Sequence, residues 1–335
     1  MSDPEDTPQE QSSFPGPDSV SGQPLLDDPG QPLLDDPDQL SQPVAPPRTE
    51  EAVELFQSWS QPQPASPLRI PHLGHLCLLA TLALLGLAVS AVLMLAALRF
   101  HLFGVKSLAQ AATDIHYILG EEALLYLVTL ALGLVVFPMF WNKSFFAGLQ
   151  WRGSTALRLR TRLFAVSLGC FALAALDGIL LPGPSNAPIE EIFRSPGAAW
   201  LMFGFGVTLA PFFEEIAFRG FLLPALATAY DWVGERLSHT PPRPLRNDGS
   251  PQWSLPAMVI ASIATSVPFA LLHGQQTGHA LGPLLLLILV SLILCAVRLV
   301  TCSLAASTLV HACYNFLLFS LMMIGTGGFQ HLNKM

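Results

Sequence analysis

Long runs of apolar residues alternate with short polar or charged segments from residue 73 onward. The hydrocarbon core of a bilayer is about 30 Å thick, so a helix needs about 20 apolar residues to cross it. A helix suits this setting because it satisfies its own backbone hydrogen bonds inside lipid. The pattern therefore predicts an all-α, polytopic transmembrane bundle of about seven or eight spans. The clearest candidates are residues 73–98, 123–140, 163–181, 199–228, 255–273, 281–297 and 303–323.

The first 72 residues have the opposite character, being acidic and rich in proline, glutamine and serine. They hold 13 of the 24 acidic residues and two of the 16 basic residues, and the sequence QPLLDDP begins at both Gln23 and Gln31. Such a segment buries too little apolar surface to offset the entropy of the chain. We expect a disordered tail at 1–72, N-terminal transmembrane helices at 73–162 and a second transmembrane domain at 163–325. A docking tail for a basic partner is the alternative, and it rests only on the repeat.

Composition and loop charge agree with residence in a membrane. The chain is 51% hydrophobic and 12% charged, whereas soluble globular domains have roughly 25% charged residues. Short loops rich in lysine and arginine stay in the cytoplasm. The richest loops are 141–162, with five bases, and 229–254, with three. We expect an integral multi-pass membrane protein with a cytoplasmic N-terminus, in the plasma (inner) membrane if the source is bacterial.

Several functional classes are disfavoured. Nucleic-acid binding is not expected, because the polar loops are short and the tail is strongly acidic. No G-x-G-x-x-G or G-x-x-x-x-G-K-[ST] motif for nucleotides occurs. All five cysteines lie in or beside apolar runs without a C-x-x-C pair, so we expect them to pack in the bundle. A catalytic thiol at Cys313 is disfavoured, because positions two apart on a helix do not face each other and His311 is two residues away.

Three ionisable side chains interrupt the fourth apolar run, in the sequence PFFEEIAFRG. A charge inside a membrane helix costs about 2.5–3.5 kcal/mol on insertion scales, so each is a candidate functional residue. Glu215 and Arg219 are spaced i, i+4 on one helix face, whereas Glu214 points about 100° away from Glu215. We expect a supporting ion pair of Glu215 with Arg219, and a free Glu214 that acts as a general base or acid.

Two further apolar runs carry polar residues of complementary chemistry. His273 ends the fifth run in PFALLH, and the seventh run contains HACYN, with His311 and Asn315 at i, i+4. Glu214 and His273 can activate a water molecule, while His311 and the Asn315 amide can donate to an oxyanion. A nucleophilic dyad of Ser307 and His311 is disfavoured, because it leaves Glu214 without a role.

A catalytic zinc site is the alternative chemistry, with Glu214, His273 and His311 as three ligands. No H-E-x-x-H motif is present. Asparagine, the residue at position 315, is a poor zinc ligand but a good oxyanion donor. We therefore favour a site without a metal cofactor and leave zinc open.

The depths of these residues along the predicted spans differ. Counting 1.5 Å per residue from the expected cytoplasmic ends places His311 at about 12 Å, Glu214 at about 21 Å and His273 at about 27 Å. The three side chains can share one site only if the helices tilt or if the fifth span runs past His273.

The three motifs together resemble the CAAX protease and bacteriocin-processing family, also called the CPBP or Abi family, which includes the CAAX prenyl protease 2 enzymes. The family pattern is E-E-x-x-x-R, F-x-x-x-H and H-x-x-x-N or D, and the chain has EEIAFR, FALLH and HACYN in that order. The likeness covers about residues 163–323 and implies that 163–325 is the catalytic domain of an intramembrane endopeptidase. It also implies a role for each motif residue: Glu214 and His273 in water activation, His311 and Asn315 in oxyanion binding, and Glu215 and Arg219 in support.

The resemblance bears on the substrate less closely than on the reaction. Eukaryotic members of the family cut a tripeptide from prenylated C-termini, whereas many bacterial relatives have unknown substrates. We expect a peptide or membrane-protein substrate, whether prenylated or not. Two other functions stay open: a non-catalytic bacteriocin-immunity or scaffold protein of the same fold, and a proton-coupled transporter that uses Glu214. The chain lacks none of the motif residues and has no visible inverted repeat, which favours the peptidase.

Overall fold

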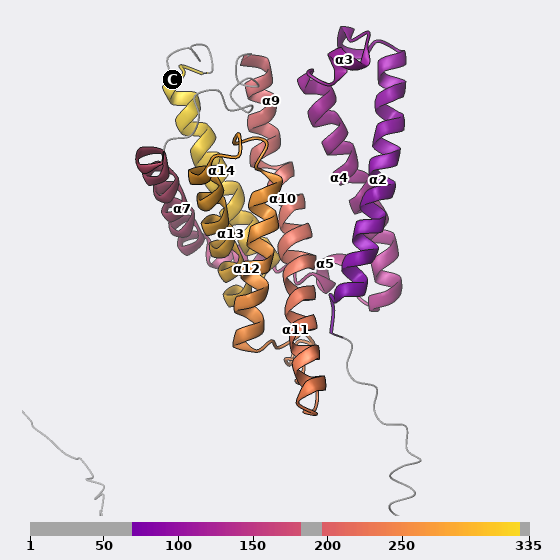
Figure 1. The fold of residues 1–335 in the computed structure, drawn as a ribbon, viewed down its shortest axis with the longest axis vertical. Helices are drawn as coiled ribbons and strands as arrows, with labels where there is room; N and C mark the ends of the chain where they lie inside the picture. The colour runs from indigo at the N-terminus through magenta and orange to yellow at the C-terminus, as the bar shows by residue number, and fades with distance from the viewer. Residues whose placement is uncertain (1–68, 182–195, 329–335) are drawn as a thin grey trace, which may run out of the picture. The chain divides into compact units, whose positions relative to one another are not determined.

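The computed structural model describes residues 69–181 and 196–328, and this part of the chain contains helices and no strand. Almost all of the acidic segment 1–72 lies outside the described residues. Figure 1 shows long helices running side by side. They are α2 (Leu73–Arg99), η2 (Leu102–Gly104), α3 (Leu108–Ala111), α4 (Ile115–Trp141), α5 (Phe145–Gly148), α6 (Gly153–Arg158), α7 (Arg160–Leu180), α9 (Pro196–Val207), α10 (Leu209–Glu215), η3 (Ile216–Leu222), α11 (Leu223–Leu237), α12 (Leu255–Leu272), α13 (Leu281–Thr301) and α14 (Leu304–Gly325).

Seven helical segments of the described chain are long and apolar enough to cross a membrane, as the hydrophobic pattern predicts. Two of them exceed the expected length by the most. The second begins at Ile115 rather than at residue 123, and it includes Glu121 and Glu122, which an uncharged run leaves out. The fourth is a 41-residue series of helices that ends at Leu237.

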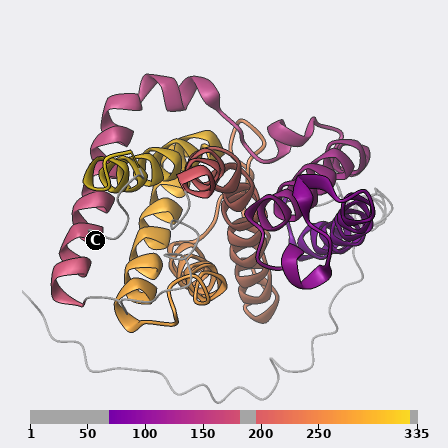
Figure 2. The same cartoon turned by 90° about the horizontal axis from the view of Figure 1, so that it is seen from above.

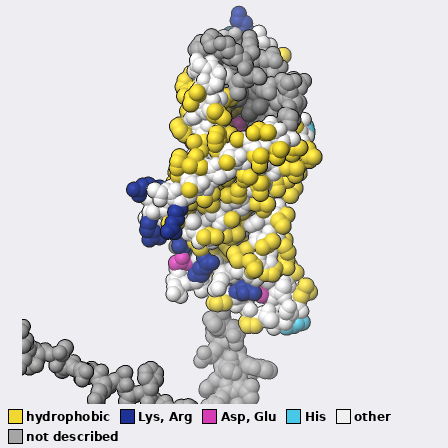
Figure 3. Space-filling view, turned by 90° about the vertical axis from the view of Figure 1, so that its left-hand side faces the viewer, with side chains coloured by type: hydrophobic (Ala, Val, Ile, Leu, Met, Phe, Trp, Pro, Cys, Tyr) yellow, Lys and Arg dark blue, Asp and Glu magenta, His cyan; other side chains and the backbone are white. Residues whose placement is uncertain are grey.

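The outside of the bundle is largely apolar. Figure 3 shows yellow apolar side chains over most of one face, with lysine and arginine gathered toward its lower part. Large apolar side chains such as Leu84, Val92 and Ile179 are more than half exposed on the spans. Such a surface is unfavourable in water and favourable in hydrocarbon. The prediction of an all-α membrane bundle is confirmed.

The segment η3 lies at the centre of the helix contacts. It packs against α2, α12, α13 and α14, while α2 and α4 form a closely packed pair beside it (Figure 2). Because η3 directly follows Glu215, these helices surround the charged residues of the fourth span.

Two local features fix the position of α14. Ser303 is its N-cap: the hydroxyl accepts from Ala306 N at 3.2 Å and donates to the Arg152 carbonyl at 3.0 Å. Near the other end, Gly206 of α9 lies against Phe319, where a Cβ atom would come within 2.8 Å of the ring. A small residue therefore allows α9 and α14 to approach closely.

Candidate active site

The fourth span changes its helical geometry at the acidic residues. Helix α10 ends at Glu215, and η3 (Ile216–Leu222) is π-helical, with hydrogen bonds that span five residues instead of four. π-helical turns are rare and frequently occur at functional sites. Glu214 and Glu215 therefore lie at the junction of two helix types.

Glu215 and Arg219 form a fully buried ion pair. Arg219 Nη1 donates to Glu215 Oε1 at 2.8 Å, and neither side chain has exposed surface. Arg219 Nη2 also donates to the hydroxyl and the carbonyl of Ser291, at 2.6 and 3.2 Å. The guanidinium carbon lies 4.5 Å from the ring centroid of Phe269. These contacts join the fourth span to α13 and α12.

Glu214 lies between two histidines from other helices. Its Oε1 is 3.7 Å from His273 Nε2, and its Oε2 is 3.7 Å from His311 Nε2. The side chain of Glu214 is 16% exposed, so it is largely but not completely buried. Each gap is longer than a hydrogen bond, yet one water molecule can bond to both atoms across it. The arrangement has the spacing needed to hold a water molecule against a carboxylate.

The other nitrogen of each imidazole has an acceptor beside it. His273 Nδ1 is 2.8 Å from the carbonyl oxygen of Phe269, one turn earlier in α12. His311 Nδ1 is 3.1 Å from Glu215 Oε1, the carboxylate oxygen paired with Arg219. A carbonyl or carboxylate oxygen can only accept, so each Nδ1 carries a proton. In the neutral rings, both Nε2 atoms are then acceptors that face Glu214.

Asn315 lies one turn beyond His311 on α14. Its Nδ2 donates to the carbonyl of Gly206 at 2.8 Å, across the close approach of α9 and α14. An amide nitrogen carries two hydrogens, so this bond orients the group and leaves one donor unused by that contact.

The alternative nucleophiles have other surroundings. The hydroxyl of Ser307 is buried and donates to the Leu304 carbonyl at 3.0 Å, while His311 Nδ1 faces Glu215. Cys313 is half-buried, and every cysteine of the chain is a free thiol.

The structure brings together residues that simple depth counting separated. Figure 1 shows the start of α12 lower in the bundle than the start of α14, with the end of α11 lower still. The ends of these helices therefore do not lie at one level, and the assumption that they do, on which the depth count relied, was wrong. His273 is the C-cap residue of α12, so the fifth span does not need to run past it.

Two residues of α4 beside this site were missed in the sequence. Tyr126 stacks on Phe213, the residue before Glu214, with ring centroids 4.8 Å apart. Its hydroxyl donates to Glu122 Oε1 at 2.7 Å. Glu122 is close enough to interact electrostatically with both Glu214 and His273. The available signal was the sequence EEALLY at 121–126, an acidic pair with a tyrosine one turn later on a membrane helix.

Comparison with known proteins adds one finding. Residues 196–317 match the family described as Rce1-like, type II CAAX prenyl endopeptidase Rce1-like. The matched segment contains all six motif residues, namely Glu214, Glu215, Arg219, His273, His311 and Asn315. No curated protein and no solved structure matched the chain.

Proposed function

Because residues 196–317 belong to the Rce1-like family of type II CAAX prenyl endopeptidases, we propose that the chain is an intramembrane endopeptidase that uses an activated water. The observation that supports this mechanism best is the convergence of two histidine Nε2 atoms on the two oxygens of Glu214, each at 3.7 Å. A single polar side chain inside a membrane bundle can have many roles. A carboxylate between two imidazoles with oriented protons is the arrangement that acid–base catalysis needs.

The proposed reaction begins with a water molecule held between Glu214 and His273. Glu214 takes one proton from the water, while the water oxygen bonds to the carbonyl carbon of the scissile peptide. The carbonyl π electrons move to oxygen and give a tetrahedral oxyanion. As that intermediate collapses, the C–N bond breaks and the proton held by Glu214 passes to the leaving nitrogen. The products are a carboxylic acid and an amine, and no covalent enzyme intermediate forms.

The remaining motif residues have supporting roles in this proposal. The unused N–H of Asn315 and a protonated Nε2 of His311 are the donors proposed for the oxyanion. Glu215 orients the imidazole of His311, because its carboxylate lies against the other ring nitrogen. Arg219 holds Glu215 in place and balances its charge.

The substrate is proposed to be a peptide or membrane protein that reaches the site within the bilayer, and a prenylated C-terminus is the first to test. The basic loops support a cytoplasmic N-terminus and, in a bacterium, the inner membrane. The test compares the termini of membrane proteins in cells that produce the wild type or a Glu214→Gln variant. New termini that need Glu214 are expected. Identical termini in both cells, together with no cleavage of a farnesylated CAAX peptide by the purified wild type, would rule out the proposal.

The donor atoms at this site suit zinc, but the distances between them do not. Both imidazoles have Nδ1 bound to an oxygen acceptor, as histidine ligands of metals usually do. Ligands on one tetrahedral zinc are roughly 3.3 Å apart, which is less than the 3.7 Å gaps here. No group of three histidine, cysteine, aspartate or glutamate side chains suited to a metal ion occurs within 69–181 and 196–328. The proposed steps therefore use no metal.

Chelation separates the two mechanisms. Prolonged incubation with phenanthroline is expected to leave peptide cleavage within about twofold of the untreated rate, because the proposed base is a carboxylate and needs no metal. A catalytic zinc ion would be exchangeable, so the chelator would remove it. Cleavage and bound metal are measured on the same sample. Loss of activity that returns when zinc is added would overturn the metal-free proposal.

Glu122 offers a prediction with a matched control one residue away. Glu122→Gln is expected to lower kcat about tenfold, because it removes a charge that interacts electrostatically with Glu214 and His273 in a medium of low dielectric constant. Glu121→Gln makes the same chemical change one position earlier on α4, and both acids line a cavity of about 700 Å³ between α2, α3 and α4. The Glu121→Gln substitution should change kcat by less than about twofold. Equal effects of the two substitutions on kcat would assign Glu122 no special role.

A further inference from the structure

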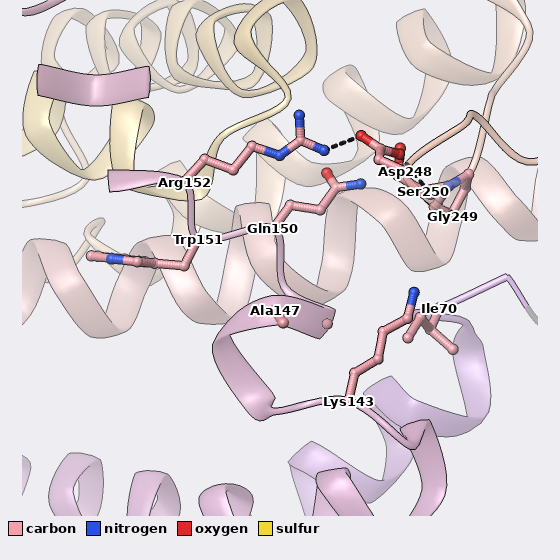
Figure 4. A pocket seen from close by; sticks show the side chains of 11 residues that line it. Ile70, Lys143, Ala147, Gln150, Trp151, Arg152, Asp248, Gly249 and Ser250 are labelled. Atoms are coloured by element: carbon pink, nitrogen blue, oxygen red, sulfur yellow. Dashed lines mark hydrogen bonds and ion pairs between the residues drawn. The ribbon is translucent and has the colours of Figure 1, made fainter. Parts of the chain in front are cut away.

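A polar pocket of about 400 Å³ lies at the end of the bundle where α4 ends, away from the Glu214 site. Figure 4 shows the side chains of Lys143, Gln150 and Arg152 reaching toward the turn that carries Asp248. The walls come from the segment before α2, the α4–α5 turn, the end of α5 with the linker to α6, and the turn before α12. The pocket is lined by Ile70, Lys143, Ala147, Gly148, Gln150, Trp151, Arg152, Asp248, Gly249, Ser250 and Pro251.

These walls are held by the surrounding bundle. The carbonyls of Gln150 and Arg152 accept from the backbone and hydroxyl at the start of α14, at 3.1 and 3.0 Å. On the opposite wall, Arg246 N donates to the Ser250 carbonyl at 2.8 Å and closes the turn. The conformation at Gly249 has a φ of +73°, which favours glycine. The pocket therefore exists before any ligand binds.

Positive charge exceeds negative charge in this pocket. Arg152 donates to Asp248 in an ion pair. Hydrogen bonds from Ser250 and Arg152 lower the pKa of Asp248 to about 2, so Asp248 is ionised at neutral pH and offsets Arg152. The Lys143 ammonium lies beside Gly249, where a Cβ atom would be 3.1 Å from it, and it has no ion pair within the described residues. Among the described residues, the Lys143 ammonium is therefore without a counter-charge.

The position of the pocket favours a ligand that comes from the membrane. Two tryptophans mark this position: Lys143 of the pocket wall comes two residues after Trp141, the last residue of α4, and Trp151 itself forms part of the wall. Tryptophan is typical of the level of lipid headgroups. On the last turn of α4, Met139 and Phe140 are 76% and 59% exposed, which offers apolar surface to a lipid chain. The loops at this end also carry most of the basic residues in the described chain.

We propose that this pocket binds the phosphate of an anionic phospholipid, with Lys143, Gln150 and Arg152 as its donors. A phosphate diester is a strong acceptor, and the arginine guanidinium and lysine ammonium are its usual protein partners. Basic pockets at the ends of membrane helices bind anionic headgroups by the same chemistry. Free phosphate shares the charge but lacks chains that pack on α4.

The experiment uses the full-length protein in maltoside detergent and measures its Tm and lipid affinity. Phosphatidylglycerol is expected to raise the Tm by several degrees more than phosphatidylcholine or inorganic phosphate, because only the bound folded state gains the contact. High salt should reduce the difference. Equal shifts with phosphatidylglycerol and phosphatidylcholine would overturn the proposal. An equal shift with inorganic phosphate would also overturn it, since the lipid chains would then contribute nothing.

Charge substitutions locate the effect. Lys143→Gln should weaken phosphatidylglycerol binding about fivefold, as expected for one basic residue near an anionic lipid. Lys106→Gln is the matched control, because it removes a lysine before α4 rather than after it, and it should leave affinity unchanged. Asp248→Asn should strengthen binding, since it removes the negative charge and keeps an acceptor for Ser250. Retained affinity in Lys143→Gln would place the lipid elsewhere.

Discussion

Glu214→Gln is expected to lower the rate of peptide cleavage by about a thousandfold, a typical contribution of a general base. The substitution removes basicity and nearly preserves shape. Glu214 has 3.7 Å gaps to both histidines and no direct hydrogen bond to either, so its loss should leave helix packing intact. Cleavage of a farnesylated CAAX peptide by the purified variant measures the effect. Its Tm should stay within about 2 °C of the wild-type value.

Two comparisons make this result specific. Glu121→Gln changes another acid on a membrane helix in the same way and should retain nearly full activity. Glu214→Asp keeps the carboxylate but withdraws it from the histidines, so an intermediate rate is expected. Wild-type turnover by Glu214→Gln would refute glutamate as the base, whatever the role of the histidines.

Glu215→Gln is expected to act on folding more than on chemistry. Removing one partner of a buried ion pair costs about 3–5 kcal/mol, because the other charge stays in a low-dielectric setting. Arg219 keeps its bonds to Ser291 and its contact with the Phe269 ring, which offset only part of that cost. A fall in Tm of roughly 10 °C and poor yield from membranes are expected.

A double substitution tests the cause of that instability. Glu215→Gln with Arg219→Met removes both charges, and replacing a whole buried pair by apolar groups is often neutral. The double variant should therefore melt at a higher temperature than Glu215→Gln alone, although it should remain inactive. If the single variant melts like the wild type, the pair contributes little to stability and its proposed supporting role fails.

The sequence was informative where helix geometry and lipid decide the outcome. Apolar run length predicts the seven spans because hydrocarbon penalises unpaired backbone groups strongly. The i, i+4 spacing of Glu215 and Arg219 predicts the contact seen at 2.8 Å. The catalytic roles of Glu214, His273, His311 and Asn315 stay predictions, since geometry shows proximity and not turnover.

Other features depend on interactions between helices that no local pattern reveals. Glu122 lies beside the site through Tyr126 and Phe213, yet its charge placed it just outside the second span expected from the sequence, which begins at residue 123. The bond from Asn315 to Gly206 depends on how closely α9 approaches α14. The staggered helix ends depend on loop lengths and on packing, so depth could not be counted from each loop independently.

The π-helical turn at Ile216–Leu222 also alters what a helical wheel can say about the fourth span. Each α-helical residue advances by 100°, and a π turn takes in about one residue more than an α turn. The faces before and after it are therefore out of phase by roughly 100°. Upstream, Glu214 faces the histidines; downstream, Asp231 of α11 accepts from Ser254 N at 2.8 Å and anchors the loop before α12. One continuous helix can thus aim two functional faces in directions that an unbroken wheel would not allow.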